Sequence, residues 1–188
     1  VNDSDYLHEV YTASDPTYTG RVSVPLLWDG EAGTVVNEES ADIMQTLAAN
    51  FANHEGVDLY PEDSSAEIDR VIADLYDPIN RGVYYAGFAT DQAEYEAAVE
   101  QVFDALDRWE AVLADQRYLL GDRLTLADLR LFATLVRFDA VYYTHFMVNR
   151  RRIVDYPNLW GFTRDIYQTG DVAATVNGIV ALSLAVLS

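Results

Sequence analysis

Two short apolar runs near the start of the chain have the residue types of β-strands. Residues 22–28, which read VSVPLLW, and residues 34–36 are short apolar runs with β-branched side chains, and the Gly-containing turn 29–33 joins them. Two such runs separated by about five residues predict a hairpin. We expect one helix before the hairpin, over 6–13, and one after it, over 38–52, with Asn37 as the N-cap of the second.

Beyond residue 53 the pattern takes the period of an α-helix. A polar connector covers 54–63, and Ser64 and Glu67 then have the spacing of a capping box. Thr125 and Asp128 have the same cap spacing, ahead of a segment that is apolar on nearly every side and should be buried. The helices expected in this part cover 64–82, about 90–113, 126–146 and 157–168.

This order of elements predicts an α+β protein with three parts. Residues 1–52 hold the hairpin, residues 53–177 form a helical bundle, and residues 178–188 are an atypical apolar tail. A hairpin with one helix is too small to bury both faces of its sheet, so we expect residues 1–52 to be only part of a domain.

The charge of the chain is strongly negative. Its 12 basic residues are all arginine and face 31 acidic residues, which gives a net charge of −19. Such a chain repels nucleic acid and anionic membranes, so we exclude both as partners. The excess of carboxylates is typical of proteins adapted to high salt, although a merely acidic protein is the alternative.

Cysteine is absent from the 188 residues. This excludes a disulfide, a zinc–thiolate site and a thiol nucleophile within them, and we expect no metal. The first residues carry no signal pattern, and the apolar tail is too short to span a membrane, which takes about 20 residues. These features favour a cytoplasmic protein.

Pro25 lies inside a predicted strand, where a proline is normally excluded. If its position faces a ligand, the backbone of Val24 is free to pair with an extended, peptide-like molecule. Glu39 and Ser40 lie at a helix N-terminus, where the carboxylate can bind an ammonium group and the hydroxyl and amides can bind a carboxylate. A γ-glutamyl amino acid carries both groups. Alternatively, Pro25 ends an edge strand and Ser40 only occupies the first turn of a helix.

Several separated motifs resemble one known family. VSVPLLWDGEAGTVVNEESADI resembles the last ββα of a thioredoxin-like glutathione transferase domain, and LLGDRLTLADLRLF resembles the capping-box helix of that superfamily. YLHEVYTASDPTYTGRVSVPLLWD, NRGVYYAGFAT, RFDAVYYTHF and RRIVDYPNLWGFTRDIYQTGDVAATVN are similar to the glutathionyl-hydroquinone reductases, or xi-class glutathione transferases. The resemblance covers residues 6–177. It implies a partial thioredoxin-like domain followed by the all-α bundle of a glutathione transferase.

The resemblance also implies a glutathione site in the first part. Val24 would pair with the cysteinyl backbone of glutathione, with Pro25 in the cis form. Glu39 and Ser40 would hold the γ-glutamyl end, and Arg21 would reach a glutathione carboxylate. Another γ-glutamyl thiol would make the same contacts and stays an alternative.

Two tyrosines of the helical part match residues that bind the quinol in this family. They are Tyr84 and Tyr142, for which filling of the core is the alternative role. The resemblance further implies a homodimer formed through the helical domains. The partners expected are therefore a small-molecule thiol, a quinol and a second copy of the chain.

The chemistry of the family is thiol exchange, in which a cysteine thiolate attacks the sulfur of a glutathionyl-hydroquinone. That cysteine belongs to an earlier βαβ segment, which these residues do not contain, and His8, His54 and His145 are too scattered to replace it. The resemblance therefore implies an amino-terminally truncated reductase, of haloarchaeal type by its charge, that is inactive in the thiol step. The alternatives are a non-catalytic binding or assembly module and an ordinary glutathione transferase that uses a tyrosine or a serine.

Overall fold

The structure is a computed structural model that describes residues 2–51 and 56–177. The chain forms two compact units, Val1–Asp58 and Leu59–Ser188, and each is described by itself. His54 and the apolar tail 178–188 lie outside the described residues.

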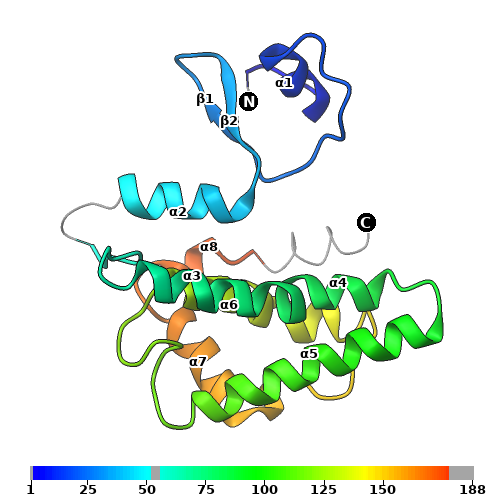
Figure 1. Cartoon of the computed structure of the whole chain (residues 1–188), viewed down its shortest axis with the longest axis vertical. Coiled ribbons are helices and arrows are strands. Elements are labelled where there is room, and N and C mark those ends of the chain that lie inside the picture. The colour runs from blue at the N-terminus through cyan, green and yellow to red at the C-terminus, as the bar shows by residue number, and fades with distance from the viewer. Residues whose placement is uncertain (1, 52–55, 178–188) are drawn as a thin grey trace. The chain divides into compact units, whose positions relative to one another are not determined.

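The first unit contains a hairpin, a helix before it and a helix after it (Figure 1). The hairpin is antiparallel and places Asp29 opposite Thr34. The Asp29 carboxylate accepts hydrogen bonds from the backbone N–H groups of Glu31 and Ala32, which fix the turn and lower the pKa of Asp29. The elements are α1 (Leu7–Ser14), β1 (Leu27–Asp29), β2 (Thr34–Asn37) and α2 (Ser40–Asn50).

The first predicted strand is shorter than the sequence suggested. Only Leu27–Asp29 pairs with β2, so the prediction of a strand from Val22 was wrong. The segment before β1 contains the cis peptide bond between Val24 and Pro25. Proline has no N–H to give to a ladder, and Val24 is 75% exposed; among the described residues, strand pairing does not continue before Leu27.

The N-cap of α2 is Glu39, and the assignment of that role to Asn37 was wrong. The side-chain oxygen of Asn37 accepts a hydrogen bond from the backbone N–H of Glu39 at 2.8 Å. Asn37 thus forms a turn one step earlier, and the helix itself begins at Ser40.

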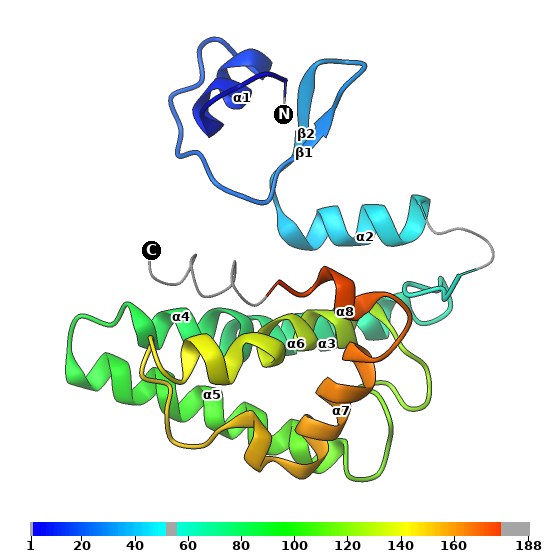
Figure 2. The same cartoon turned by 180° about the vertical axis from the view of Figure 1, so that it is seen from behind.

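The second unit is a helical bundle in which α5 packs against α4 and α7, while α6 packs against α3 and α7 (Figures 1 and 2). Within the described residues no helix is long and apolar enough to cross a membrane. The elements are α3 (Ser65–Leu75), the π-helix η1 (Tyr76–Arg81), α4 (Gly82–Gly87), α5 (Gln92–Val112), α6 (Leu126–Arg137), the π-helix η2 (Phe138–Tyr142), the 3-10 helix η3 (Ile153–Asp155), α7 (Pro157–Tyr167) and α8 (Val172–Thr175).

Two helices predicted as continuous α-helices contain π turns instead. The helix expected to end near Gly82 widens at η1 and continues to Gly87 as α4. Pro78 lies inside η1 and has no N–H for an i→i−4 bond, which explains the change of pitch there. The helix expected to reach Phe146 ends as an α-helix at Arg137 and continues only as η2.

The start of α6 has the capping box that the sequence predicted. Asp128 accepts hydrogen bonds from the N–H and the hydroxyl of Thr125, and also from the N–H of Leu119 in the preceding loop. Burial raises the pKa of Asp128, and these three hydrogen bonds oppose that rise. The box therefore joins the loop to the central helix.

Candidate functional site

The backbone of Val24 is open. Among the residues that the structure describes, neither its N–H nor its C=O has a hydrogen-bond partner. Its side chain is exposed, and the segment lies directly before β1. An extended ligand could therefore pair with this residue as a strand would.

The acid–serine pair lies at the start of α2, as the sequence predicted. Glu39 is exposed, and within the described ranges its carboxylate has no ion-pair partner. Ser40 is the first residue of the helix and is partly buried. First-turn amides of a helix lack intrahelical acceptors, so this end offers donors to a ligand carboxylate while Glu39 offers an acceptor to an ammonium group.

Arg21 is also exposed, in the loop before Val24. Its backbone carbonyl accepts a hydrogen bond from the Tyr18 hydroxyl at 2.7 Å. The guanidinium forms no ion pair within the described part of the first unit. It is available to an anionic group.

In the second unit, Tyr84 and Tyr142 meet through their hydroxyls at 3.1 Å. Tyr84 is in α4, just after the π turn η1, and Tyr142 is the last residue of the π turn η2. π turns occur often at functional sites, because they shift side chains out of the α-helical register. The rings of Phe88 and Phe146 lie within 6.3 Å and 5.4 Å of the Tyr84 ring and complete an aromatic cluster.

The two tyrosines differ in access. Tyr84 is 39% exposed, whereas Tyr142 is 2% exposed, so only Tyr84 reaches the surface. Burial raises the pKa of Tyr142, and the hydrogen bond to Tyr84 raises it further. Tyr142 therefore stays protonated and can donate to Tyr84, whose own O–H is then free to donate to a ligand oxygen.

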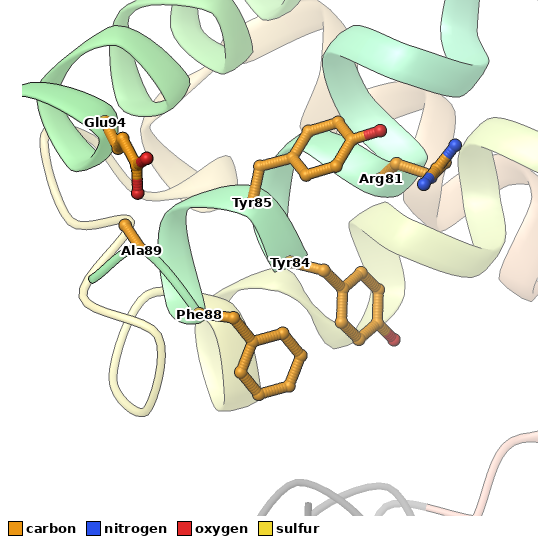
Figure 3. A pocket seen from close by; sticks show the side chains of 6 residues that line it. All are labelled: Arg81, Tyr84, Tyr85, Phe88, Ala89 and Glu94. Carbon is orange, nitrogen blue, oxygen red and sulfur yellow. The ribbon is translucent and has the colours of Figure 1, made fainter. Parts of the chain in front are cut away.

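The surface around Tyr84 is a pocket of about 620 Å³, and Tyr84 is the one lining residue that the sequence motifs had indicated. Tyr84 and Phe88 project on one side of α4, and Tyr85 extends toward Arg81 (Figure 3). The Arg81 guanidinium lies 5.0 Å from the centre of the Tyr85 ring. Tyr84 and Phe88, like Arg81 and Tyr85, are four residues apart, and this i,i+4 spacing on a helix is the signal that could have revealed the pocket. The lining residues are Arg81, Tyr84, Tyr85, Phe88, Ala89 and Glu94.

Of the described histidines, only His145 adjoins one of these groups, because its ring packs against Phe146 of the aromatic cluster. His8 is exposed and stacks on Tyr6, and His145 is exposed beside Phe146. In the part of the chain that the structure describes, no three or more His, Asp or Glu side chains gather as a metal site would require.

Comparison with known proteins defines the class of the fold. Residues 92–165 match the family model of the glutathione S-transferase C-terminal domain. The glutathione-bound structure of YqjG from Escherichia coli superposes with a TM-score of 0.89, at 47% identity over 94% of this chain and 58% of that one. The chain thus has the fold of the glutathione transferases, with the ββα end of a thioredoxin-like domain followed by a helical bundle. The predicted fold class is confirmed.

Among the similar proteins are glutathionyl-hydroquinone reductases and xi-class glutathione transferases. The glutathionyl-hydroquinone reductase PcpF of Sphingobium chlorophenolicum is 49% identical over 94% of this chain and 57% of its own length. The xi-class glutathione transferase of Natrialba magadii is 52% identical, with a TM-score of 0.91 over 97% of this chain and 56% of that one. The chain therefore spans a little over half the length of the curated relatives that it matches.

Proposed function

We propose that these residues bind glutathione, or another γ-glutamyl thiol, in a protein of the glutathionyl-hydroquinone reductase type. The open backbone of Val24 is the observation that carries this proposal, because it offers one donor and one acceptor to the cysteinyl part of the ligand. Glu39 and Ser40 would bind the γ-glutamyl ammonium and carboxylate, and Arg21 the second carboxylate. The glutathione-bound structure of a similar protein supports this assignment.

The quinol would bind at the aromatic pocket beside Tyr84. Phe88 and Tyr84 offer exposed aromatic faces, and the Tyr84 hydroxyl, which is supported by Tyr142, would donate to a quinol oxygen. The curated relatives named for this reaction support the choice of a quinol.

In the proposed reaction a thiolate attacks the sulfur of a glutathionyl-hydroquinone. A sulfur–sulfur bond forms, the bond between sulfur and the ring carbon breaks, and the ring carbon takes up a proton. A second glutathione then releases the first as glutathione disulfide. Because the 188 residues contain no cysteine, the attacking thiolate must come from outside them, and the role proposed for these residues is binding.

The setting proposed for the protein is a salt-rich cytoplasm. The net charge of −19 and the similarity to a Natrialba protein support adaptation to high salt. We also propose a homodimer, in keeping with the family that the motifs resemble.

Calorimetric titration with glutathione tests the proposal. Glu39→Gln and Ser40→Ala should each weaken binding by about tenfold, because each removes a hydrogen bond to a charged group of the ligand. Glu31→Gln removes an exposed carboxylate of the hairpin turn and is the matched control. Affinity that is equal in all three variants would contradict the thiol site.

A second titration, with the glutathionyl-hydroquinone as ligand, tests the proposed quinol site. Tyr84→Phe should weaken binding of the glutathionyl-hydroquinone and leave glutathione affinity unchanged. An equal loss for both ligands would assign Tyr84 to the fold and not to quinol recognition.

A further inference from the structure

Tyr11 links the two parts of the proposed thiol site through one hydroxyl. The ring is 4% exposed, and the hydroxyl donates to the Glu38 carboxylate at 2.6 Å. The same oxygen lies 3.3 Å from the N–H and 3.0 Å from the C=O of Ser23. Ser23 directly precedes Val24, and Glu38 directly precedes Glu39.

The Tyr11 hydroxyl has a single proton, so its hydrogen bonds to Ser23 and Glu38 form a relay in which each group donates to the next. A phenol has one O–H to donate and can accept at its oxygen. The charge-assisted bond to Glu38 is the shorter one, so the proton goes there, and the Ser23 N–H donates to the Tyr11 oxygen. The amide before Val24 is thereby connected to the carboxylate before Glu39.

Tyr18 supports the same loop from the other side. Its ring centre lies 4.9 Å from that of Tyr11, and its hydroxyl donates to the carbonyl of Arg21. The loop passes so close that a Cβ at Gly20 would lie 2.5 Å from the Tyr18 oxygen. Two adjoining tyrosines therefore hold the backbone on both sides of Val22.

We propose that Tyr11 is a positioning residue for thiol binding, which sets the spacing between the open backbone of Val24 and the γ-glutamyl subsite at Glu39. This inference rests on the proposed function. A glutathione that pairs with Val24 and also reaches Glu39 needs the Val24 backbone and the Glu39 carboxylate to be held at a fixed distance from each other. A separation that is already set before binding avoids the ordering cost that a loose loop imposes.

The experiment measures glutathione affinity by calorimetry in four variants, with thermal unfolding recorded for each. Tyr11→Phe and Glu38→Ala should each weaken binding by about tenfold, because either one removes the charge-assisted link. Glu38→Gln keeps an acceptor for the Tyr11 hydroxyl and should restore most of the affinity. The control is Tyr6→Phe, which removes the hydroxyl of an exposed tyrosine in the same unit and should leave affinity unchanged.

The outcomes separate this inference from the proposed function. Unchanged affinity in Tyr11→Phe and Glu38→Ala, even with a lower melting temperature, would overturn the positioning role and leave the thiol site standing. Affinity in Glu38→Gln as weak as in Glu38→Ala would also overturn it, since charge and not the link would then matter. If the unaltered protein binds no glutathione, the proposed function fails and this inference with it. Should Tyr11→Phe not fold, the two Glu38 variants decide, because Glu38 is exposed.

Discussion

At Gly87 the lack of a side chain decides how α4 packs against the aromatic cluster. A Cβ built at this position would lie 2.4 Å from Cγ of Phe146, whose ring is buried beside Tyr84. A rigid ring cannot move aside as the end of a flexible chain can. Glycine is therefore required here by space, although alanine is the better helix former.

We therefore predict that alanine substitution changes the free energy of unfolding in opposite directions at two helical glycines. Gly87→Ala should lower the free energy of unfolding by about 1–3 kcal/mol, because overpacking outweighs the gain in helix propensity. Gly161→Ala in α7 meets nothing within 4 Å and should raise that free energy by about 0.5–1 kcal/mol. Chemical denaturation measures both. Stabilisation by both substitutions would refute the role given to Phe146.

Residue-scale features differ in how far the sequence reveals them. The capping box of Thr125 and Asp128 was predicted and is confirmed. The capping box predicted at Ser64 and Glu67 was wrong: Ser64 is the N-cap of α3, but its hydroxyl donates to Asp63. The hydrogen bond from Tyr11 to Glu38 joins residues 27 positions apart, and no local pattern announces it. Asn37 shows the intermediate case, where the local signal was genuine but belonged to the turn just before the helix.

At the scale of elements, the apolar periodicity predicted where helices lie, but it did not predict which segments are π-helical. The helical face over 90–113 corresponds to α5, whose N-cap Asp91 accepts from the N–H of Glu94. The π turns η1 and η2 were missed, since an extra residue per turn leaves little trace in an apolar pattern. Both lie next to the Tyr84–Tyr142 contact, so the aromatic site is the part of the bundle that the pattern described least well.

The attachment of α7 to the loop before α6 should depend on pH. The Asp165 carboxylate accepts two hydrogen bonds from the Arg117 guanidinium and one from the Tyr118 hydroxyl. The bonds from Arg117 hold the pKa of Asp165 below its usual value of 3.8. A depressed folded-state pKa means that the stabilisation is fully present above the unfolded-state pKa and is lost as pH falls through the folded-state value.

We therefore predict that Asp165→Asn lowers the melting temperature at pH 7. The difference from the unaltered protein should shrink as pH falls below the usual aspartate range, since protonation then removes the same interaction. Asp115→Asn changes an exposed carboxylate near Arg117 and is the control. A difference for Asp165→Asn that stayed constant down to pH 2.5 would contradict this account.

At the scale of the whole molecule, the excess of acidic residues is the dominant electrostatic feature. The net charge of −19 opposes compaction of the chain, and salt screens this repulsion. Composition alone suffices for this inference. The arrangement of the proposed binding residues is different, because it depends on a loop whose backbone Tyr11 and Tyr18 hold by hydrogen bonds at Ser23 and Arg21.

We predict that the melting temperature rises when potassium chloride is increased from dilute to molar concentration. The rise should be much smaller near pH 4.2, the isoelectric point of the sequence, where the net charge vanishes. Thermal unfolding followed by circular dichroism measures both series. A melting temperature that ignores salt at pH 7 would count against adaptation to high salt.

The most direct test of the account follows the backbone amide of Val24 by NMR while glutathione is added in molar salt. The account predicts that this amide shifts saturably and becomes protected from exchange with water, because it gains an acceptor from the ligand. The amide of Val36 on β2 serves as the internal reference and should not move. An unchanged Val24 amide at glutathione concentrations that saturate the calorimetric signal would contradict the central claim.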